Sequence, residues 1–83
     1  MRHRYFYYVF GEYLEGYRCG DRFYFDKRGN IYSYESAMNK DRCWKDRKGA
    51  TEFLTRMKAE HAASLKRFNS ITPCKFELER VPY

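Results

Sequence analysis

Residues 23–34 read FYFDKRGNIYSY, and this stretch decides how the chain folds. Two runs rich in aromatic residues flank a link of five residues, and aromatic side chains favour β-strands. Asp26 can accept hydrogen bonds from the backbone amides that follow it, and Gly29 can adopt the positive φ that a tight turn needs. The stretch therefore predicts a β-hairpin that turns at residues 26–30.

The segments on either side of the hairpin predict further strands. Residues 5–10 are all aromatic or β-branched, which is typical of a strand, and Gly11-Glu12 predicts a tight turn after it. Residues 13–18 return either as a second strand or as a loop. Apolar and charged residues alternate over residues 74–81, and this alternation predicts a final strand.

A long amphipathic helix is predicted over residues 47–68, after a short helical turn within residues 35–41. Asp46 is the expected N-cap, because its carboxylate can accept a hydrogen bond from a free amide of the first turn. Apolar-stripe positions recur at helical spacing; they are Ala50, Phe53, Leu54, Met57, His61, Leu65 and Phe68.

These elements predict one small α+β domain over residues 1–83. Its sheet has about four antiparallel strands, an N-terminal meander plus the C-terminal strand, and the long helix covers one face. We expect the opposite face of the sheet to meet water or a partner.

The sequence offers no pattern for catalysis or for metal binding. Cys19, Cys43, Cys74 and His61 could supply four zinc ligands, but they lack the close pairs that structural zinc sites use. His61 falls on the apolar stripe, so we expect a packed, hydrogen-bonded histidine there. Glycine-rich phosphate loops are absent from the sequence. We therefore expect a protein that is not an enzyme and that uses no metal or cofactor.

Composition narrows the class of partner. The 83 residues carry a net charge of +6, which favours an acidic macromolecule such as a host protein, a nucleoprotein complex or nucleic acid. No apolar run reaches the length of a membrane span, so no membrane partner is expected. Three cysteines without paired spacing indicate free thiols and a cytoplasmic protein. No oligomeric state is indicated.

Tyrosine and arginine supply the first candidate binding surface. Alternation predicts that Tyr5 and Tyr7 lie on the same face of their strand. It likewise predicts that Tyr32 and Tyr34 lie on the same face of theirs. If these side chains lie opposite the helix, they form an aromatic patch of the kind enriched at interfaces; Arg4, Arg22 and Arg28 surround it. The alternative is that the tyrosines build a second, minor core.

A basic segment supplies the second candidate surface. Residues 40–48 hold five cations, two anions and Trp44, which we expect to pack inward because tryptophan is buried on average. The cations can neutralise phosphates or pair with acidic side chains; they are Lys40, Arg42, Lys45, Arg47 and Lys48.

The whole pattern resembles a loose group of small bacteriophage-encoded α+β proteins. The shared features are the aromatic first strand, the Asp-x-x-Gly-Asn hairpin at residues 26–30, Ala37, Trp44 and a helix that begins Ala-x-x-Phe-Leu at residues 50–54. The resemblance implies a protein that binds a host complex stoichiometrically, as an inhibitor or modulator of a defence system in the host cytoplasm. Direct binding of nucleic acid through the same cations is the alternative.

Overall fold

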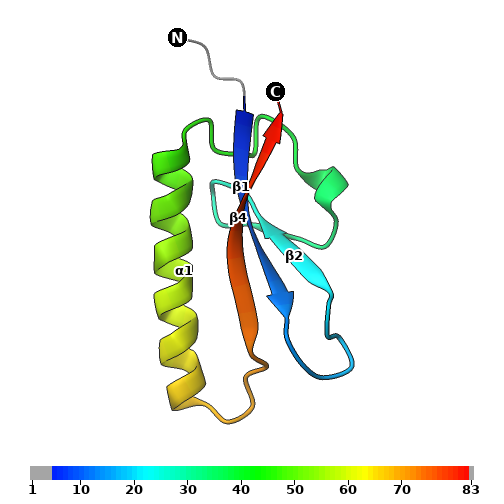
Figure 1. Ribbon diagram of the computed structural model, residues 1–83, viewed down its shortest axis with the longest axis vertical. Coiled ribbons are helices and arrows are strands. Elements are labelled where there is room, and N and C mark those ends of the chain that lie inside the picture. Colours follow the sequence, from blue (N-terminus) through cyan, green and yellow to red (C-terminus); the bar gives the residue numbers. More distant parts are fainter. Residues whose placement is uncertain (1–4, 83) are drawn as a thin grey trace.

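A computed structural model describes residues 5–82 of the chain. Four antiparallel strands form one sheet in the order β3-β2-β1-β4, and a single long helix packs on it (Figure 1). This arrangement confirms the predicted α+β class, the N-terminal meander and the C-terminal strand. The elements are β1 (Tyr5–Tyr13), β2 (Arg22–Phe25), β3 (Ile31–Tyr32), the short 3-10 helix η1 (Glu35–Ala37), α1 (Arg47–Arg67) and β4 (Cys74–Pro82).

The predicted hairpin is confirmed. Strands β2 and β3 pair through Tyr24 with Tyr32 and through Phe25 with Ile31. Gly29 has a φ of +87°, which a residue with a Cβ adopts only under strain. The second strand is shorter than the aromatic run, because the chain leaves the sheet after Tyr32 to enter η1.

Strand β1 is longer than predicted, and the predicted turn at Gly11-Glu12 is wrong. Both residues lie inside β1, which pairs with β4 from Tyr5 to Tyr13. A Cβ built on Gly11 would lie 2.3 Å from Cζ of Phe23, so glycine stands there to admit an aromatic ring instead of to turn the chain. The chain reverses direction after Tyr13. Of the two alternatives for residues 13–18, the loop is therefore correct from residue 14 onward.

Both faces of the sheet are covered, whereas the sequence predicted one covered and one open face. On the face of α1, Val9, Phe25 and Phe53 form a buried cluster. The opposite face carries a second buried cluster, which residues 33–43 cover; its members are Phe6, Tyr8, Phe10, Tyr24 and Cys43. Figure 1 shows α1 on one side of the sheet and η1 on the other. A second core therefore exists, but of the four tyrosines considered in the sequence analysis only Tyr32 packs against it.

The helix begins as predicted. The side chain of Asp46 accepts a hydrogen bond of 2.7 Å from the amide of Gly49. The apolar stripe is only partly buried, because the last turn of α1 reaches beyond the start of β4 (Figure 1). Leu65 and Phe68 consequently remain 39% and 49% exposed. The expectation for His61 is confirmed, since its Nε2 accepts a hydrogen bond of 2.9 Å from the amide of Cys74.

Candidate binding surface

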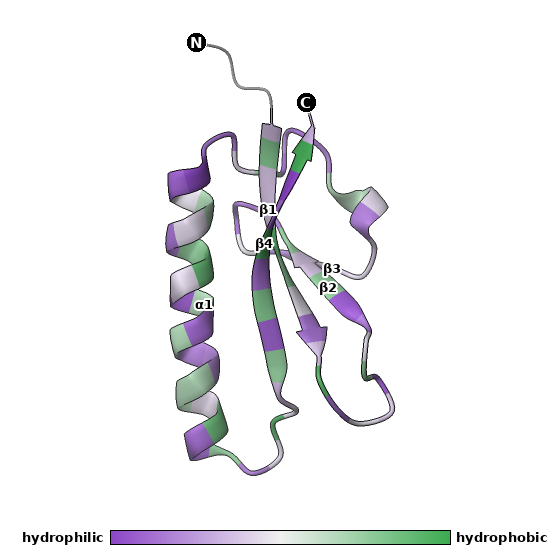
Figure 2. Ribbon diagram, in the orientation of Figure 1, coloured by the Kyte–Doolittle hydropathy of each residue, from purple (hydrophilic) through white to green (hydrophobic). Residues whose placement is uncertain are grey.

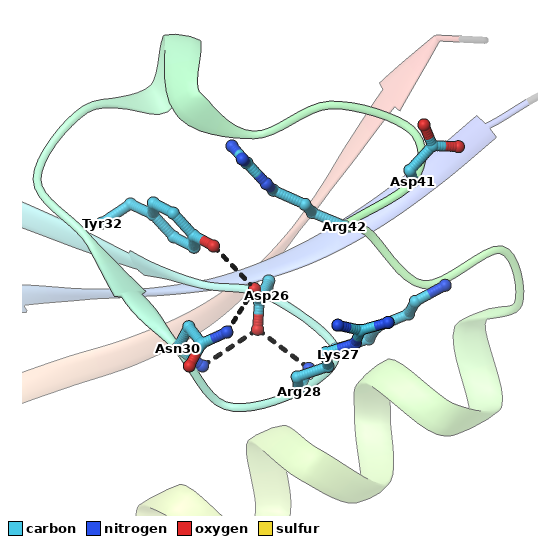
Figure 3. Close-up of a pocket in the computed structure, with 7 residues that line it drawn as sticks. All are labelled: Asp26, Lys27, Arg28, Asn30, Tyr32, Asp41 and Arg42. Atoms are coloured by element: carbon cyan, nitrogen blue, oxygen red, sulfur yellow. Dashed lines mark hydrogen bonds between the residues drawn. The ribbon is translucent and has the colours of Figure 1, made fainter.

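The hairpin turn and the basic segment meet at a hollow of about 300 Å³. The amide of Lys27 donates a hydrogen bond of 2.8 Å to the carbonyl of Arg42, and this bond ties the two stretches together. Side chains from both stretches line the hollow (Figure 3); they are Asp26, Lys27, Arg28, Asn30, Tyr32, Asp41 and Arg42. We refer to this site as the Asp26 hollow.

Asp26 organises the turn from a nearly inaccessible position, with 2% of its surface exposed. One carboxylate oxygen accepts hydrogen bonds of 2.9 Å from the amides of Arg28 and Asn30. The other oxygen accepts from Nδ2 of Asn30 at 3.2 Å and from the hydroxyl of Tyr32 at 2.9 Å (Figure 3). Burial alone would raise the pKa of Asp26, but these four bonds outweigh it and lower the pKa. All four donors are neutral, and none of the ion pairs found among residues 5–82 involves this carboxylate, although its charge still lowers the positive potential of the hollow.

Arg42 is held in place at the edge of the hollow. Its guanidinium stacks over the ring of Tyr32 at 5.0 Å and donates to the carbonyl of Ala37. The hydroxyl of Tyr32 is in turn fixed by Asp26. The two side chains therefore present a pre-arranged cation and aromatic ring, which lowers the entropy cost of binding.

Several exposed cations of this region form no ion pair within residues 5–82, and the same holds for Lys58, Lys66, Arg67 and Arg80 elsewhere. Arg18, Arg22, Arg56 and Lys75 each form an ion pair. Among residues 5–82, no ion pair involves five exposed cations of the hairpin turn and the basic segment; they are Lys27, Arg28, Lys45, Arg47 and Lys48. Asp41 is the exposed acid of the hollow.

Three of the predicted binding residues thus line one hollow, namely Arg28, Tyr32 and Arg42. Lys27 belongs with them, although the sequence analysis did not select it. Its position beside Asp26 in the turn was a usable signal, because any long side chain there projects from the hairpin. Lys40, Lys45 and Lys48 are exposed on the neighbouring segment but do not line the hollow.

The remaining predicted residues do not form the aromatic patch. Alternation along β1 places Tyr5 and Tyr7 on the face of Val9 and therefore on the α1 side, whereas Tyr32 pairs with Tyr24 on the opposite face. Arg22 is occupied by an ion pair of 2.9 Å with a glutamate of β1.

The other members of the predicted patch are also dispersed. Tyr34 is 74% exposed, but it lies beyond β3 at the start of η1. Arg47 lines a different hollow, together with Tyr7, Leu78 and Arg80. Arg4 falls outside the described residues. Trp44 packs against Phe53 with ring centroids 5.0 Å apart, as predicted.

His61 and Cys74 are neighbours, joined by the hydrogen bond from the Cys74 amide to His61. Within the described part of the chain, no three His, Cys, Asp or Glu residues gather in a way that could hold a metal ion. Burial, reinforced by the negative charge of Asp26, raises the pKa of the Cys43 thiol, so this thiol stays protonated and unreactive. Over residues 5–82, no helix has both the length and the apolar character needed to cross a membrane.

Comparison with protein-family models, with curated protein sequences and with solved structures gives no significant match to this chain. The resemblance to small bacteriophage proteins therefore stays a prediction that rests on the residues quoted above.

Proposed function

We propose that this chain is a non-catalytic binding protein that acts stoichiometrically on an acidic macromolecular partner. The observation that carries the proposal is the hydrogen bond from Lys27 to Arg42, since it joins the two basic stretches around the Asp26 hollow. The contact residues we assign are Lys27, Arg28, Tyr32 and Arg42, with Lys40, Lys45 and Lys48 as outlying charges.

The chemistry of the hollow suits carboxylate or phosphate groups. Unpaired cations raise the rate of encounter with an acidic surface, and a fixed guanidinium can bind two oxygens at once. Arginine and tyrosine are also among the residues that contribute most to interface energy. Because Arg42 and Tyr32 are held in place already, little side-chain entropy is lost when a partner binds.

The resemblance to bacteriophage proteins favours a partner within a host complex in the cytoplasm, inhibited or modulated by this chain. The second candidate is direct binding of nucleic acid. It is favoured by Arg42 stacked on Tyr32, because aromatic rings beside cations are the usual means of holding a single strand.

The test is affinity capture from a bacterial lysate, with and without nuclease, using the double variant Lys27→Glu/Arg28→Glu. A matched control, Arg56→Glu/Lys66→Glu, changes the net charge equally on exposed positions of α1 and removes only the solvent-exposed ion pair of Arg56 with Glu60, which contributes little to stability. We expect the first variant to lose its partner and the control to keep it, with both thermal midpoints near that of the parent. Equal binding by all three proteins would refute the assignment to the Asp26 hollow.

A salt titration with short single-stranded and duplex oligonucleotides separates the two candidates. Phosphate contacts give a steep dependence of affinity on salt concentration. Capture that survives nuclease, together with weak oligonucleotide binding, favours a protein partner. Capture that disappears with nuclease favours nucleic acid.

A further inference from the structure

Strand β4 forms one edge of the sheet and is nine residues long. Its inner side pairs with β1 along its whole length. Figure 2 shows apolar and polar residues alternating along β4, as on a strand with two different faces. A long edge strand presents unpaired backbone groups, to which another extended chain can add.

The direction of these backbone groups follows from the neighbours of β1. The amides of Tyr7 and Tyr13 bond to Trp44 and Asp21, on the side of β1 away from β4. The even-numbered residues of β1 therefore exchange hydrogen bonds with β4. Their directly opposed partners in β4 are the odd-numbered residues, such as Glu77 opposite Phe10.

The even-numbered residues of β4 consequently point their amides and carbonyls outward. His61 already satisfies the amide of Cys74, which agrees with this direction. Pro82 has no amide to offer. Three alternate residues, Phe76, Leu78 and Arg80, are thus left as outward donors and acceptors on this edge.

Two hollows flank the open edge on the α1 side. One has a volume of about 320 Å³, and its lining includes Lys58, Ala62, Leu65 and Phe76. The other, of about 180 Å³, is lined by Tyr7, Arg47, Leu78 and Arg80. Both combine apolar surface with cations. Alternate side chains of an added strand would point toward these hollows, as they do when a peptide extends a sheet.

Charge decides which occupant fits. A second copy of this chain carries the same net charge of +6 and is repelled from a cationic groove. A segment with acidic side chains is attracted to Lys58, Arg47 and Arg80 instead. We therefore infer that the outer edge of β4 binds an extended acidic peptide segment of a partner protein as a fifth strand. This site is separate from the Asp26 hollow and does not depend on the function proposed there.

The probe for this site is a capped peptide of alternating valine and glutamate, with a peptide of alternating valine and lysine as its control. Nuclear magnetic resonance of the full chain follows the amide signals and the rates of amide hydrogen exchange. We expect the glutamate peptide to shift and protect the amides of Phe76, Leu78 and Arg80. The lysine peptide should leave them unchanged.

Two matched pairs of variants separate charge from backbone pairing. Arg80→Ala removes a cation, and Arg80→Pro removes the same cation and the outward amide, so the proline variant should bind at least about threefold more weakly than the alanine variant. Lys58→Glu reverses a charge in the groove, whereas Arg56→Glu reverses one that does not line it. Of these two variants, only Lys58→Glu should bind the glutamate peptide more weakly than the parent. Circular dichroism and the thermal midpoint establish that each variant is folded.

Three results would overturn the inference. The first is an absence of protection at the three amides when the glutamate peptide is present. The second is equal affinity of folded Arg80→Pro and Arg80→Ala for that peptide. The third is self-association of the chain through the same amides without any peptide, since the edge would then serve a second copy.

Discussion

Replacing Asp26 tests how much of the hairpin depends on one buried carboxylate. Asp26→Ala removes the acceptor of four hydrogen bonds, two from backbone amides and two from side chains. A hydrogen bond to a charged group contributes about 1.5–3 kcal/mol when its partners are desolvated. The donors belong to a turn whose other residues are exposed, so water replaces part of the loss. We expect the free energy of unfolding to fall by about 3 kcal/mol.

Asp26→Asn gives a sharper version of the same test. The asparagine oxygen can still accept the bonds from Arg28 and Asn30, but its amide group cannot accept from Nδ2 of Asn30. The hydroxyl of Tyr32 can turn to accept instead of donate. We therefore expect about half the effect of alanine, or about 1.5 kcal/mol.

The pH dependence supplies the control. The folded protein lowers the pKa of Asp26, so the carboxylate stabilises the fold fully above its unfolded pKa, near 3.9. This contribution is lost as the pH falls through the lower, folded pKa. The difference in stability between the parent and Asp26→Asn should therefore be largest at neutral pH and shrink below about pH 4.

Urea denaturation at several pH values measures these differences, with the fluorescence of the single tryptophan, Trp44, as the signal. Trp44 packs against Phe53 and reports on the core between α1 and the sheet. Two outcomes would refute the reasoning. One is an Asp26→Asn protein as stable as the parent at neutral pH; the other is a stability difference that stays constant into acid.

Three further changes test other parts of the fold. Gly11→Ala should lower the free energy of unfolding by about 2 kcal/mol, because the new Cβ collides with the ring of Phe23. In a double-mutant cycle, Gly11→Ala should cost less stability when Phe23 is already replaced by leucine. Tyr8→Phe should cost about 1–3 kcal/mol in urea denaturation, since it deletes the buried hydroxyl that contacts two glutamates at 2.7 and 2.5 Å. Leu65→Asp should keep its circular dichroism spectrum, because Leu65 is 39% exposed, whereas Phe53→Asp should unfold the chain.

The features that the sequence alone determined are those formed between near neighbours in the chain. The Asp26 turn needs only an acid, a glycine three residues later and strand-forming residues on each side. The N-cap at Asp46 likewise involves an amide three residues away. The cap of α1 and the hairpin were therefore predictable, because local hydrogen bonding dictates them whatever surrounds them.

The tertiary structure decided everything that depends on which strand lies beside which. Gly11 looks like a turn residue until Phe23 is placed over it, and only the register of β1 against β2 does so. The same register sends Tyr7 to the α1 face while Tyr32 lies on the other, which separates the predicted aromatic patch. A shift of one residue would exchange the two faces, and the sequence holds no local signal that sets it.

The candidate binding surface depends partly on local sequence signals and partly on tertiary contacts. The sequence named Arg28, Tyr32 and Arg42 as candidates, and the structure places these three around one hollow. Their meeting in one hollow depends on the hydrogen bond between Lys27 and Arg42, fifteen residues apart. The covering of the second sheet face by residues 33–43 required the folded chain as well, because strands apolar on both faces show that burial is needed but do not show which segment supplies it.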